Sequence, residues 1–326
     1  MVKNNSSSND KNRSLKVVFV LDTTVSMNRR FDDSNNRILD SMNKLVEKFL
    51  LNIQTSADLY NITEVAFITF SEGVTMETDF YRVRDLNQDC FKAKPDAYAE
   101  QKVTMKKNVI VTDPFGGPLT IQIPQFESIG VETYSRVGAG VIRALEKLDE
   151  KRKSFEDAMK NQSQGVGDNP YVPVMVVISD GAPDEFKNGV LLHTADPEEE
   201  KLAKAMVKSR CYSEGDATKL VFPIICAIGD EKVRNQMWEY AAYSEDYQYG
   251  FQYIDENHEG SGFEELIVKI GQSLTKSISL AEEKEKERKN REKALKEKHR
   301  KTERFRATSF DQDLDDAMLL RRNVQR

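Results

Sequence analysis

Residues 16–26 read KVVFVLDTTVS, and this stretch decides the fold of the chain. Residues 17–21 are apolar at every position, so a strand formed here is buried on both of its faces. Such a strand is typical of the centre of a parallel sheet that carries helices on both sides. Asp22, Thr24 and Ser26 follow at alternate positions, which lets their side-chain oxygens point the same way in an extended turn.

Apolar patterning along the rest of the chain predicts strands that alternate with helices. The first helix, over residues 38–53, repeats apolar side chains at a spacing of three and four. Further strands are expected at 62–70, 172–179, 220–228 and 251–254, with an edge strand at 74–83, and further helices at 137–159, 197–209, 231–242 and 263–278. This alternation predicts a Rossmann-like, doubly wound α/β fold with a mostly parallel central sheet and helices on both faces.

Changes in composition along the chain predict its domain organisation. Residues 1–14 are polar and of low complexity, and we expect them to be a disordered N-terminal segment. Residues 15–280 form the α/β domain. Residues 281–326 form a charged helical C-terminal extension, in which acidic and basic side chains lie three or four positions apart. Because this extension lacks a heptad of apolar positions, it is not expected to form a coiled coil.

Residues 84–126 interrupt the alternation of strands and helices. Two stretches with alternating apolar residues, 103–112 and 119–123, flank the turn sequence DPFGGP at 113–118. We therefore expect a β-rich insertion, a β-hairpin placed between core elements. It serves either as structural packing or as a surface for a partner, and the sequence favours neither over the other.

A second carboxylate, Asp180, directly follows the apolar strand predicted at 172–179. In a doubly wound sheet ligands lie at the carboxyl ends of the strands, so Asp180 is expected near Asp22. Carboxylate and hydroxyl oxygens suit Mg²⁺, and Mn²⁺ or Ca²⁺ accept the same ligands. With Thr24 and Ser26, the two carboxylates predict a divalent-metal site. Since the hydroxyls are neutral, the metal keeps positive charge that a carboxylate from a partner protein can neutralise.

The sequences DTTVS at 22–26 and ISDG at 178–181 resemble the von Willebrand factor A (vWA) domain and its metal-ion-dependent adhesion site. The motif of that family is Asp-x-Ser/Thr-x-Ser, then a Thr from a second loop and an Asp from a third. The resemblance covers residues 16–280 in the order of strands and helices. It implies a protein-binding module rather than an enzyme, with metal ligands at Asp22, Thr24, Ser26 and Asp180.

The resemblance also implies a middle ligand from the sequence GVETYSRVGAGV at 130–141. Ser135 is followed three residues later by Gly138, as in the family, whereas Thr133 preserves the threonine. The doubled glycine of the family is missing here. Both Ser135 and Thr133 therefore remain candidates for the middle ligand.

The sequence VPVMVVISDGAPDE at 172–185 is similar to that of intracellular bacterial proteins of the TerY-like tellurite-resistance and stress group. This similarity implies a scaffold or adaptor that acts with a Ser/Thr kinase and a phosphatase in a stress response.

Composition excludes several other classes of protein. The net charge of −6 disfavours a nucleic-acid binder, which needs a basic surface. The three cysteines and three histidines are scattered, and they predict neither a zinc site, a disulfide framework nor a His-based catalytic centre. No apolar run reaches the ~20 residues that cross a membrane. The N-terminal residues lack the apolar core of a signal peptide, so we expect a cytoplasmic protein. Asp184 and Glu185 are expected to be loop surface.

Two alternatives remain. In the first, the chain has the vWA fold but its metal site is structural or degenerate, and partners bind to the hairpin insertion and the tail. In the second, Asp22 is the nucleophile of a haloacid-dehalogenase-like phosphohydrolase. That chemistry uses an aspartate as general acid two positions later, where this chain has Thr24, and the sequence has no Gly-rich loop to cradle a phosphate. We therefore expect no enzymatic activity.

Overall fold

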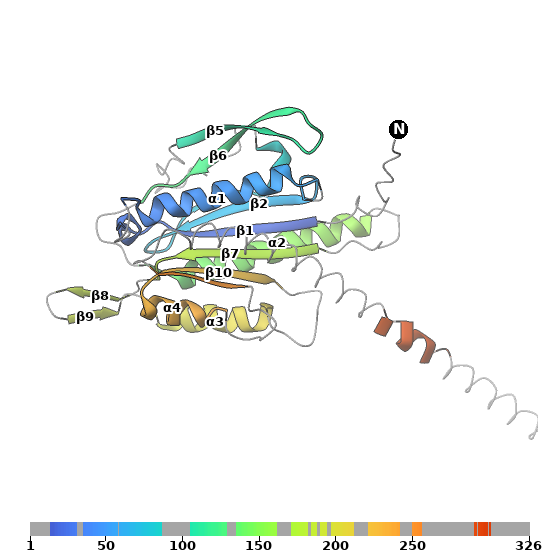
Figure 1. The fold of residues 1–326 in the computed structure, drawn as a ribbon. Coiled ribbons are helices and arrows are strands. Elements are labelled where there is room, and N and C mark those ends of the chain that lie inside the picture. Colours follow the sequence, from blue (N-terminus) through green and yellow to red (C-terminus); the bar gives the residue numbers. More distant parts are fainter. Residues whose placement is uncertain are drawn as a thin grey trace, which may run out of the picture. The chain divides into compact units, whose positions relative to one another are not determined.

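Within the unit Met1–Ala281, seven strands build one large, mostly parallel sheet, and β5–β6 and β8–β9 form two separate two-stranded sheets (Figure 1). The structure is a computed structural model that describes residues 14–30, 35–57, 59–86, 105–128, 135–161, 171–181, 184–187, 190–193, 197–211, 221–241, 250–255, 290–291, 293–298 and 300. Within these residues seven strands pair in the order β11-β10-β7-β1-β2-β3, and β4 also pairs with β2. Their bounds are β1 Ser14–Asp22, β2 Thr63–Phe70, β3 Val74–Glu77, β4 Tyr81–Arg82, β7 Tyr171–Ser179, β10 Phe222–Gly229 and β11 Phe251–Asp255.

The order of the strands creates a reversal beside β1. β1 pairs in parallel with β2 on one side and with β7 on the other. β10 continues the parallel order from β7 to β11, whereas β3 and β4 run antiparallel to β2. The chain therefore moves outward from β1 to β2 and then returns to the other side of β1 for β7. Such a reversal is the topological switch point of a doubly wound sheet, and the predicted Rossmann-like α/β fold is confirmed.

Helices cover both faces of the sheet (Figure 1). α1 packs on one face, and α2, α3 and α4 pack on the other. The last predicted core helix, at 263–278, lies outside the described residues. The bounds are α1 Ile38–Thr55, α2 Val137–Asn161, α3 Pro197–Cys211 and α4 Glu231–Trp238, with short 3-10 helices η2 Val25–Asn28 and η3 Val83–Asp85.

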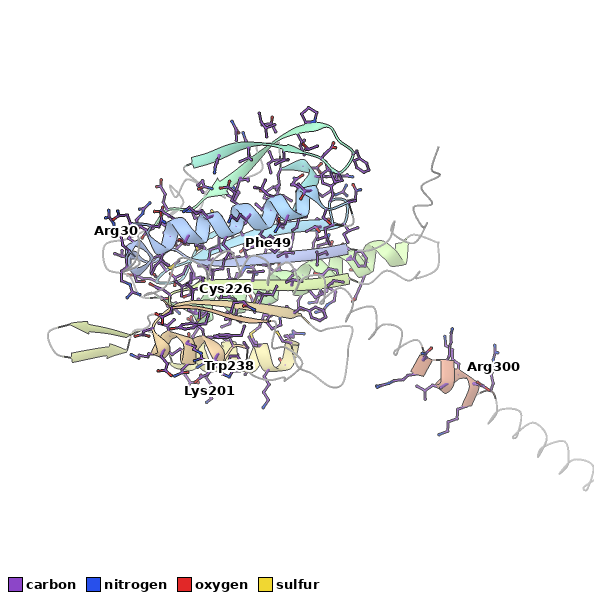
Figure 2. The ribbon with its side chains drawn as sticks, in the orientation of Figure 1. Arg30, Phe49, Lys201, Cys226, Trp238 and Arg300 are labelled. Carbon is purple, nitrogen blue, oxygen red and sulfur yellow. The ribbon has the colours of Figure 1, made fainter. Side chains whose placement is uncertain are left out.

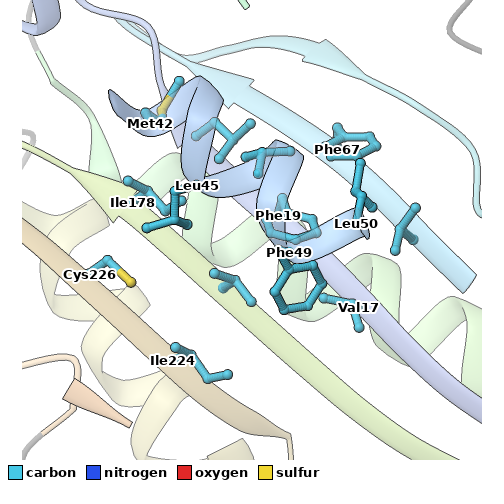
Figure 3. Packing of buried hydrophobic residues seen from close by; sticks show 14 of the residues in the cluster. Val17, Phe19, Met42, Leu45, Phe49, Leu50, Phe67, Ile178, Ile224 and Cys226 are labelled. Carbon is cyan, nitrogen blue, oxygen red and sulfur yellow. The ribbon is translucent and has the colours of Figure 1, made fainter. Parts of the chain in front are cut away.

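The central strand β1 is buried on both faces. Phe19 lies between Phe49 of α1 and Phe67 of β2, with ring centroids 4.8 Å and 5.3 Å away (Figure 3). Val18 and Val20 belong to the opposite core layer, with α2. Complete burial of a side chain such as that of Phe19 contributes about 2–3 kcal/mol. The apolar run at residues 17–21 therefore contributes side chains to both core layers.

The strand predicted at 74–83 lies at the edge of the sheet as expected, but its continuity is wrong, because the segment forms two short strands, β3 and β4. Thr78, between them, binds β2 with its backbone and its side chain at once. Its N–H donates to the carbonyl of Phe67, and its hydroxyl accepts from the N–H of Phe67, both at 2.9 Å. A side chain thus replaces one backbone group of the ladder, and the regular strand is interrupted. Alternation of apolar residues does not reveal such a replacement.

Three further segments differ from the prediction. The helix expected at 231–242 ends at Trp238, because the chain tightens into a turn in which the N–H of Tyr240 donates to the carbonyl of Met237. Ser14, expected in the disordered segment, is the first residue of β1. The expected loop at 184 and 185 is part of β8 (Asp184–Lys187), which pairs with β9 (Val190–His193). The sequences DEFK at 184–187 and VLLH at 190–193 do not alternate apolar and polar residues, so they carry no strand signal.

The insertion contains the predicted β-hairpin, formed by β5 (Met105–Thr112) and β6 (Pro118–Gln125). Its turn is shaped by Asp113, whose Oδ1 accepts from the N–H groups of Phe115 and Gly117, both at 2.8 Å. Gly116 has a φ of 89°, a conformation that glycine adopts without steric cost. The turn predicted from DPFGGP is therefore confirmed.

One face of the hairpin packs against the domain through α1. Ile121 is completely buried. Asn43 of α1 clamps the end of the hairpin, because its Nδ2 donates to the carbonyl of Phe126 at 2.9 Å and its Oδ1 accepts from the N–H of Phe126 at 2.8 Å. In contrast, Ile110 and Phe115 are 77% and 75% exposed. The insertion is structural on one side, and a partner-binding role stays a prediction for the exposed side.

Glu77, at the end of β3, ties the edge of the sheet to α2. Its carboxylate accepts from Arg143, with Nε at 2.7 Å and Nη2 at 2.9 Å, and from Nζ of Lys147 at 2.6 Å. Burial alone would raise the pKa of Glu77, but the two cations outweigh burial and hold the pKa at about 2. A charged Glu77 therefore stabilises the folded state.

The second unit, Glu282–Arg326, is described at positions 290–291, 293–298 and 300, which are helical and exposed. The side chain of Arg300 is labelled on this segment in Figure 2. In the described part of the chain, no helix combines the length and the apolar character needed to cross a membrane.

Candidate functional site

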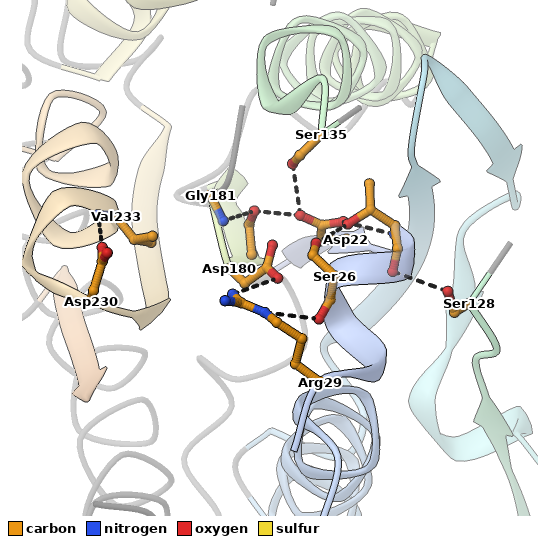
Figure 4. Close-up of polar contacts among 11 residues, drawn as sticks. Asp22, Ser26, Arg29, Ser128, Ser135, Asp180, Gly181, Asp230 and Val233 are labelled. Carbon is orange, nitrogen blue, oxygen red and sulfur yellow. Dashed lines mark hydrogen bonds and ion pairs between the residues drawn. The ribbon is translucent and has the colours of Figure 1, made fainter. Parts of the chain in front are cut away.

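Polar side chains from distant parts of the chain meet at the carboxyl ends of β1 and β7 (Figure 4). Asp22 is the last residue of β1, and Asp180 directly follows β7. Both side chains are completely buried. Because β1 and β7 are neighbours at the switch point, the topology of the sheet brings these two carboxylates to one place.

Four hydrogen bonds hold the carboxylate of Asp22. Its Oδ1 accepts from the N–H of Thr24 at 2.9 Å and from the hydroxyl of Thr24 at 2.6 Å. Its Oδ2 accepts from the hydroxyls of Ser135 at 2.8 Å and Ser179 at 2.6 Å. Burial raises the pKa of Asp22, and the hydrogen bonds oppose this rise. Asp22 is therefore fixed in orientation from both sides.

The hydroxyl of Ser26 continues the chain of oxygens that begins at Asp22. Ser26 Oγ lies 2.8 Å from Thr24 Oγ1. The carbonyl of Thr24 in turn accepts from the hydroxyl of Ser128 at 3.0 Å, which fixes the backbone of the loop. Ser26 lies in η2, directly after this loop, and is half-buried. The alternate spacing of Asp22, Thr24 and Ser26 thus places three oxygen groups in a row.

Asp180 differs from Asp22 in how it is satisfied. Its Oδ2 forms an ion pair with Nη2 of Arg29 at 3.3 Å. Its Oδ1 is buried and has no hydrogen-bond partner among the described residues. Burial, and after it the charge of Asp22, raise the pKa of Asp180 to about 7. A buried carboxylate oxygen without a donor is costly, so this atom is suited to a cation.

Ser135 is positioned by its neighbour Arg136, just before α2. The N–H of Arg136 donates to the carbonyl of Ser71 at 2.9 Å, and its Nη1 donates to the carbonyl of Glu72 at 3.0 Å. Arg136 also forms an ion pair with Glu199 of α3. Thr133, the other candidate for the middle ligand, lies outside the described residues. The structure thus brings Ser135 together with the other predicted site residues.

Sequence reasoning missed two residues of the site, Ser179 and Arg29. Ser179 accepts from the N–H of Gly181 at 2.8 Å while it donates to Asp22, so it links the two strand ends. Its signal in the sequence is that it is the one hydroxyl residue in the otherwise apolar run VPVMVVIS at 172–179. Arg29 carries no comparable signal, because several arginines are near it in the sequence.

The donor set fits a hard divalent cation held mainly by oxygen. Within the described residues, no group of three or more His, Cys, Asp or Glu side chains gathers in one place. The ligands on offer are two carboxylates and three hydroxyls, an oxygen-only set of the kind that Mg²⁺ accepts together with water. The unpartnered Oδ1 of Asp180 is the oxygen with free capacity.

Comparisons with known proteins give only distant structural matches. No family model matches the chain, and no curated protein matches it. Solved structures with a similar fold include the pilus adhesin SpaC from Lactobacillus rhamnosus GG, at 15% identity and a TM-score of 0.40. Proximal thread matrix protein 1 from the mussel byssus, with a zinc-occupied MIDAS motif, matches at 14% and 0.38. Von Willebrand factor type A from Catenulispora acidiphila matches at 11% and 0.36.

These matches cover 83%, 80% and 80% of this chain, respectively. They cover only 30%, 46% and 43% of the other chains, so this chain spans less than half the length of each. All three TM-scores lie below 0.5. The doubly wound fold is therefore assigned from the strand order of this chain and not from the likeness.

Proposed function

We propose that this chain is a vWA-type protein-interaction domain that binds an acidic group of a partner protein through a divalent metal. Asp22, Thr24, Ser26 and Asp180 would hold the metal, with Ser135 or Thr133 as the middle ligand. The observation that carries the proposal is the buried, unpartnered Oδ1 of Asp180 next to the fixed carboxylate of Asp22. The sequence motif DTTVS and the position at the switch point support it.

The residues of the site have distinct roles in this proposal. Asp22 and Asp180 supply negative charge, while the hydroxyls supply neutral oxygens. When bound, Mg²⁺ supplies a positively charged position that the ligands of the domain do not fully neutralise. A carboxylate of the partner is the group that complements such a position. Ser179 keeps Asp22 in the orientation needed for this arrangement.

The same residues argue for binding rather than catalysis. The described part of the site has no histidine or thiol, and the hydroxyls of Thr24, Ser135 and Ser179 all donate to Asp22. A phosphohydrolase that used Asp22 as nucleophile would need a general acid at the position of Thr24. We expect no turnover of a generic phosphoester such as p-nitrophenyl phosphate. Metal-dependent hydrolysis that disappears in Asp22→Asn would contradict this part of the proposal.

A cytoplasmic stress-response or tellurite-resistance role, with a Ser/Thr kinase or phosphatase as the partner, extends the proposal. It rests on the sequence resemblance at 172–185 alone. Copurification of the chain with such a kinase from cells that express both, with loss of the complex in EDTA, would support it.

A second candidate function is binding without the metal. The ion pair between Arg29 and Asp180 favours it, because the domain itself supplies a cation to the site. The exposed Ile110 and Phe115 of the hairpin offer an apolar contact elsewhere. Binding of a partner that is indifferent to EDTA but lost in Phe115→Ser would support this candidate.

Isothermal titration with Mg²⁺, Mn²⁺ and Ca²⁺ tests the metal proposal directly. We expect at least one of these ions to bind the wild-type domain, and we expect Asp180→Asn to abolish binding. Asp230→Asn is the matched control: Asp230 caps α4 by accepting from the N–H of Val233 at 2.9 Å, away from the two strand ends (Figure 4). No detectable binding at millimolar concentrations of all three ions would refute the proposal.

A second experiment tests the carboxylate. A peptide library with a central aspartate is compared with the same library carrying asparagine, with Mg²⁺ and with EDTA. We expect enrichment of aspartate peptides that depends on the metal.

A further inference from the structure

We propose that Arg29 is a built-in counter-ion of the site: its guanidinium neutralises Asp180 when no metal is bound, and it competes with the divalent cation for that carboxylate. This inference rests on the metal-binding function proposed above and adds a residue that regulates the affinity for the metal. The competition would set the metal concentration at which the domain becomes able to bind its partner.

Arg29 contacts two of the predicted metal ligands at once. Its Nη2 reaches Oδ2 of Asp180 at 3.3 Å, across 151 positions of sequence. Its Nε donates to the backbone carbonyl of Ser26 at 3.3 Å (Figure 4). The guanidinium therefore bridges Asp180, at the end of β7, and the backbone of Ser26 in η2.

The backbone of Arg29 is fixed, so its position beside the site is built into the fold. Its N–H donates to the carbonyl of Ser26 at 2.9 Å, and its carbonyl accepts from the N–H of Ile38 at 3.0 Å. Ile38 is the first residue of α1. The start of the first helix thus holds Arg29 within reach of Asp180.

Burial of the two partners is unequal, and this makes the contact reversible. The side chain of Asp180 is 0% exposed, whereas that of Arg29 is 48% exposed. The carboxylate cannot turn to water, so a nearby cation is what allows it to stay charged. The guanidinium is already partly hydrated, so water screens its side of the ion pair. Exchange of Arg29 for another cation therefore releases a guanidinium that is already partly hydrated and keeps a positive charge beside Asp180.

The geometry of the ion pair is weak enough to be displaced. It consists of one nitrogen–oxygen contact at the long end of hydrogen-bond range, not the bidentate arrangement that gives arginine pairs their strength. Among the described residues, Oδ1 of Asp180 also has no hydrogen-bond donor. A divalent cation held at this oxygen would repel the guanidinium. Arg29 lowers the affinity of the site without closing it.

This role predicts two effects of opposite direction in one variant. Arg29→Ala leaves the two carboxylates without their cation, so it lowers the stability of the metal-free domain. It also removes the competitor, so it raises metal affinity, because the coupling between two ligands of one site is reciprocal. An arginine that served only as structure would lower both quantities.

The test compares wild type, Arg29→Ala, Arg29→Lys and the control Arg30→Ala. Arg30 is the adjacent exposed arginine; its Nη1 donates to Oδ1 of Asn35 at 3.4 Å, and it projects from the surface (Figure 2). Mg²⁺ affinity is measured by isothermal titration, and the thermal midpoint is measured in EDTA. We expect Arg29→Ala to lower the Kd for Mg²⁺ by about twofold to fivefold and to lower the midpoint in EDTA. Arg29→Lys should lie between it and wild type, and Arg30→Ala should match wild type.

Each outcome of this experiment supports or refutes the proposed role of Arg29. If wild type binds Mg²⁺ and Arg29→Ala binds it equally or more weakly, the competition is refuted while the metal function stands. If none of the four proteins binds Mg²⁺, the metal function itself is wrong and the competition falls with it. If Arg29→Ala alone binds, the competition is supported in its strongest form. An unchanged midpoint of Arg29→Ala in EDTA overturns the counter-ion role.

Discussion

Replacing Ser179 with alanine tests whether the hydrogen bonds of Asp22 hold the two central strands together. The hydroxyl of Ser179 donates to Oδ2 of Asp22 at 2.6 Å and accepts from the N–H of Gly181 at 2.8 Å. The change removes a single oxygen, so it leaves almost no cavity. Its effect is therefore electrostatic and not one of packing.

The expected cost follows from these two contacts. A hydrogen bond to a charged group contributes about 1.5–3 kcal/mol, and a buried N–H left without an acceptor costs about 1–3 kcal/mol. Since Asp22 keeps three of its donors, we take the lower half of each range. Ser179→Ala should therefore lower the free energy of unfolding by about 3 kcal/mol.

The assay is urea unfolding at pH 7 in EDTA, which removes any contribution of a bound metal. Ser128→Ala is the control, since Ser128 also donates from the edge of the site but to a neutral carbonyl, that of Thr24, at 3.0 Å. It should cost about 1 kcal/mol. If Ser179→Ala is no more destabilising than Ser128→Ala, then Asp22 is not charged and held as described.

Three further predictions concern the scaffold of the site. The pKa of Glu77 is held at about 2, below its ordinary value of 4.5, so its charged form stabilises the fold above pH 4.5. This contribution, about 3 kcal/mol at most, is lost as the pH falls towards 2. Glu77→Gln should therefore reduce the loss of stability at acidic pH, measured by urea unfolding. A methyl group on Gly140 would lie 2.7 Å from Val20, so Gly140→Ala should lower the thermal midpoint. Gly138→Ala is the control and should be tolerated, because the added methyl group meets mainly flexible glutamate side chains. Equal midpoints for the two variants would show that α2 packs less closely on the sheet than the structure indicates. Asn43→Ala should destabilise the domain by about 2 kcal/mol, because two buried hydrogen bonds to the end of the hairpin are lost. Hydrogen exchange should become faster than in wild type in β5 and β6, and less so in β1.

The sequence predicts the central layer of this fold well because its strands are buried on both faces. A run such as that at 17–21 has few alternatives to a central strand. The same logic placed Asp22 and Asp180 at one edge, since both follow such strands. No knowledge of side-chain contacts was needed for that step.

Other features depend on contacts that no local pattern records. Arg29 reaches Asp180 only because the start of α1 fixes its backbone, and several arginines nearby look equivalent in the sequence. Thr78 breaks the edge strand because its hydroxyl happens to face the N–H of Phe67. The strands β8 and β9 have four residues each and no alternation of apolar and polar residues, so no local pattern reveals them.

The long separation between the two halves of the site has a consequence for how the chain folds. Ser179 and Asp22 lie 157 positions apart in the chain, yet one hydrogen bond joins them. Pairing of β1 with β7 therefore closes a loop that contains α1, the hairpin and α2. Contacts at such separation form slowly, because the entropy of closing the intervening loop is lost first. A chain released before β7 is synthesised carries one carboxylate and no partner for it. The site is thus a late product of folding, and any ligand that needs both carboxylates distinguishes the finished domain from every shorter or partly folded form.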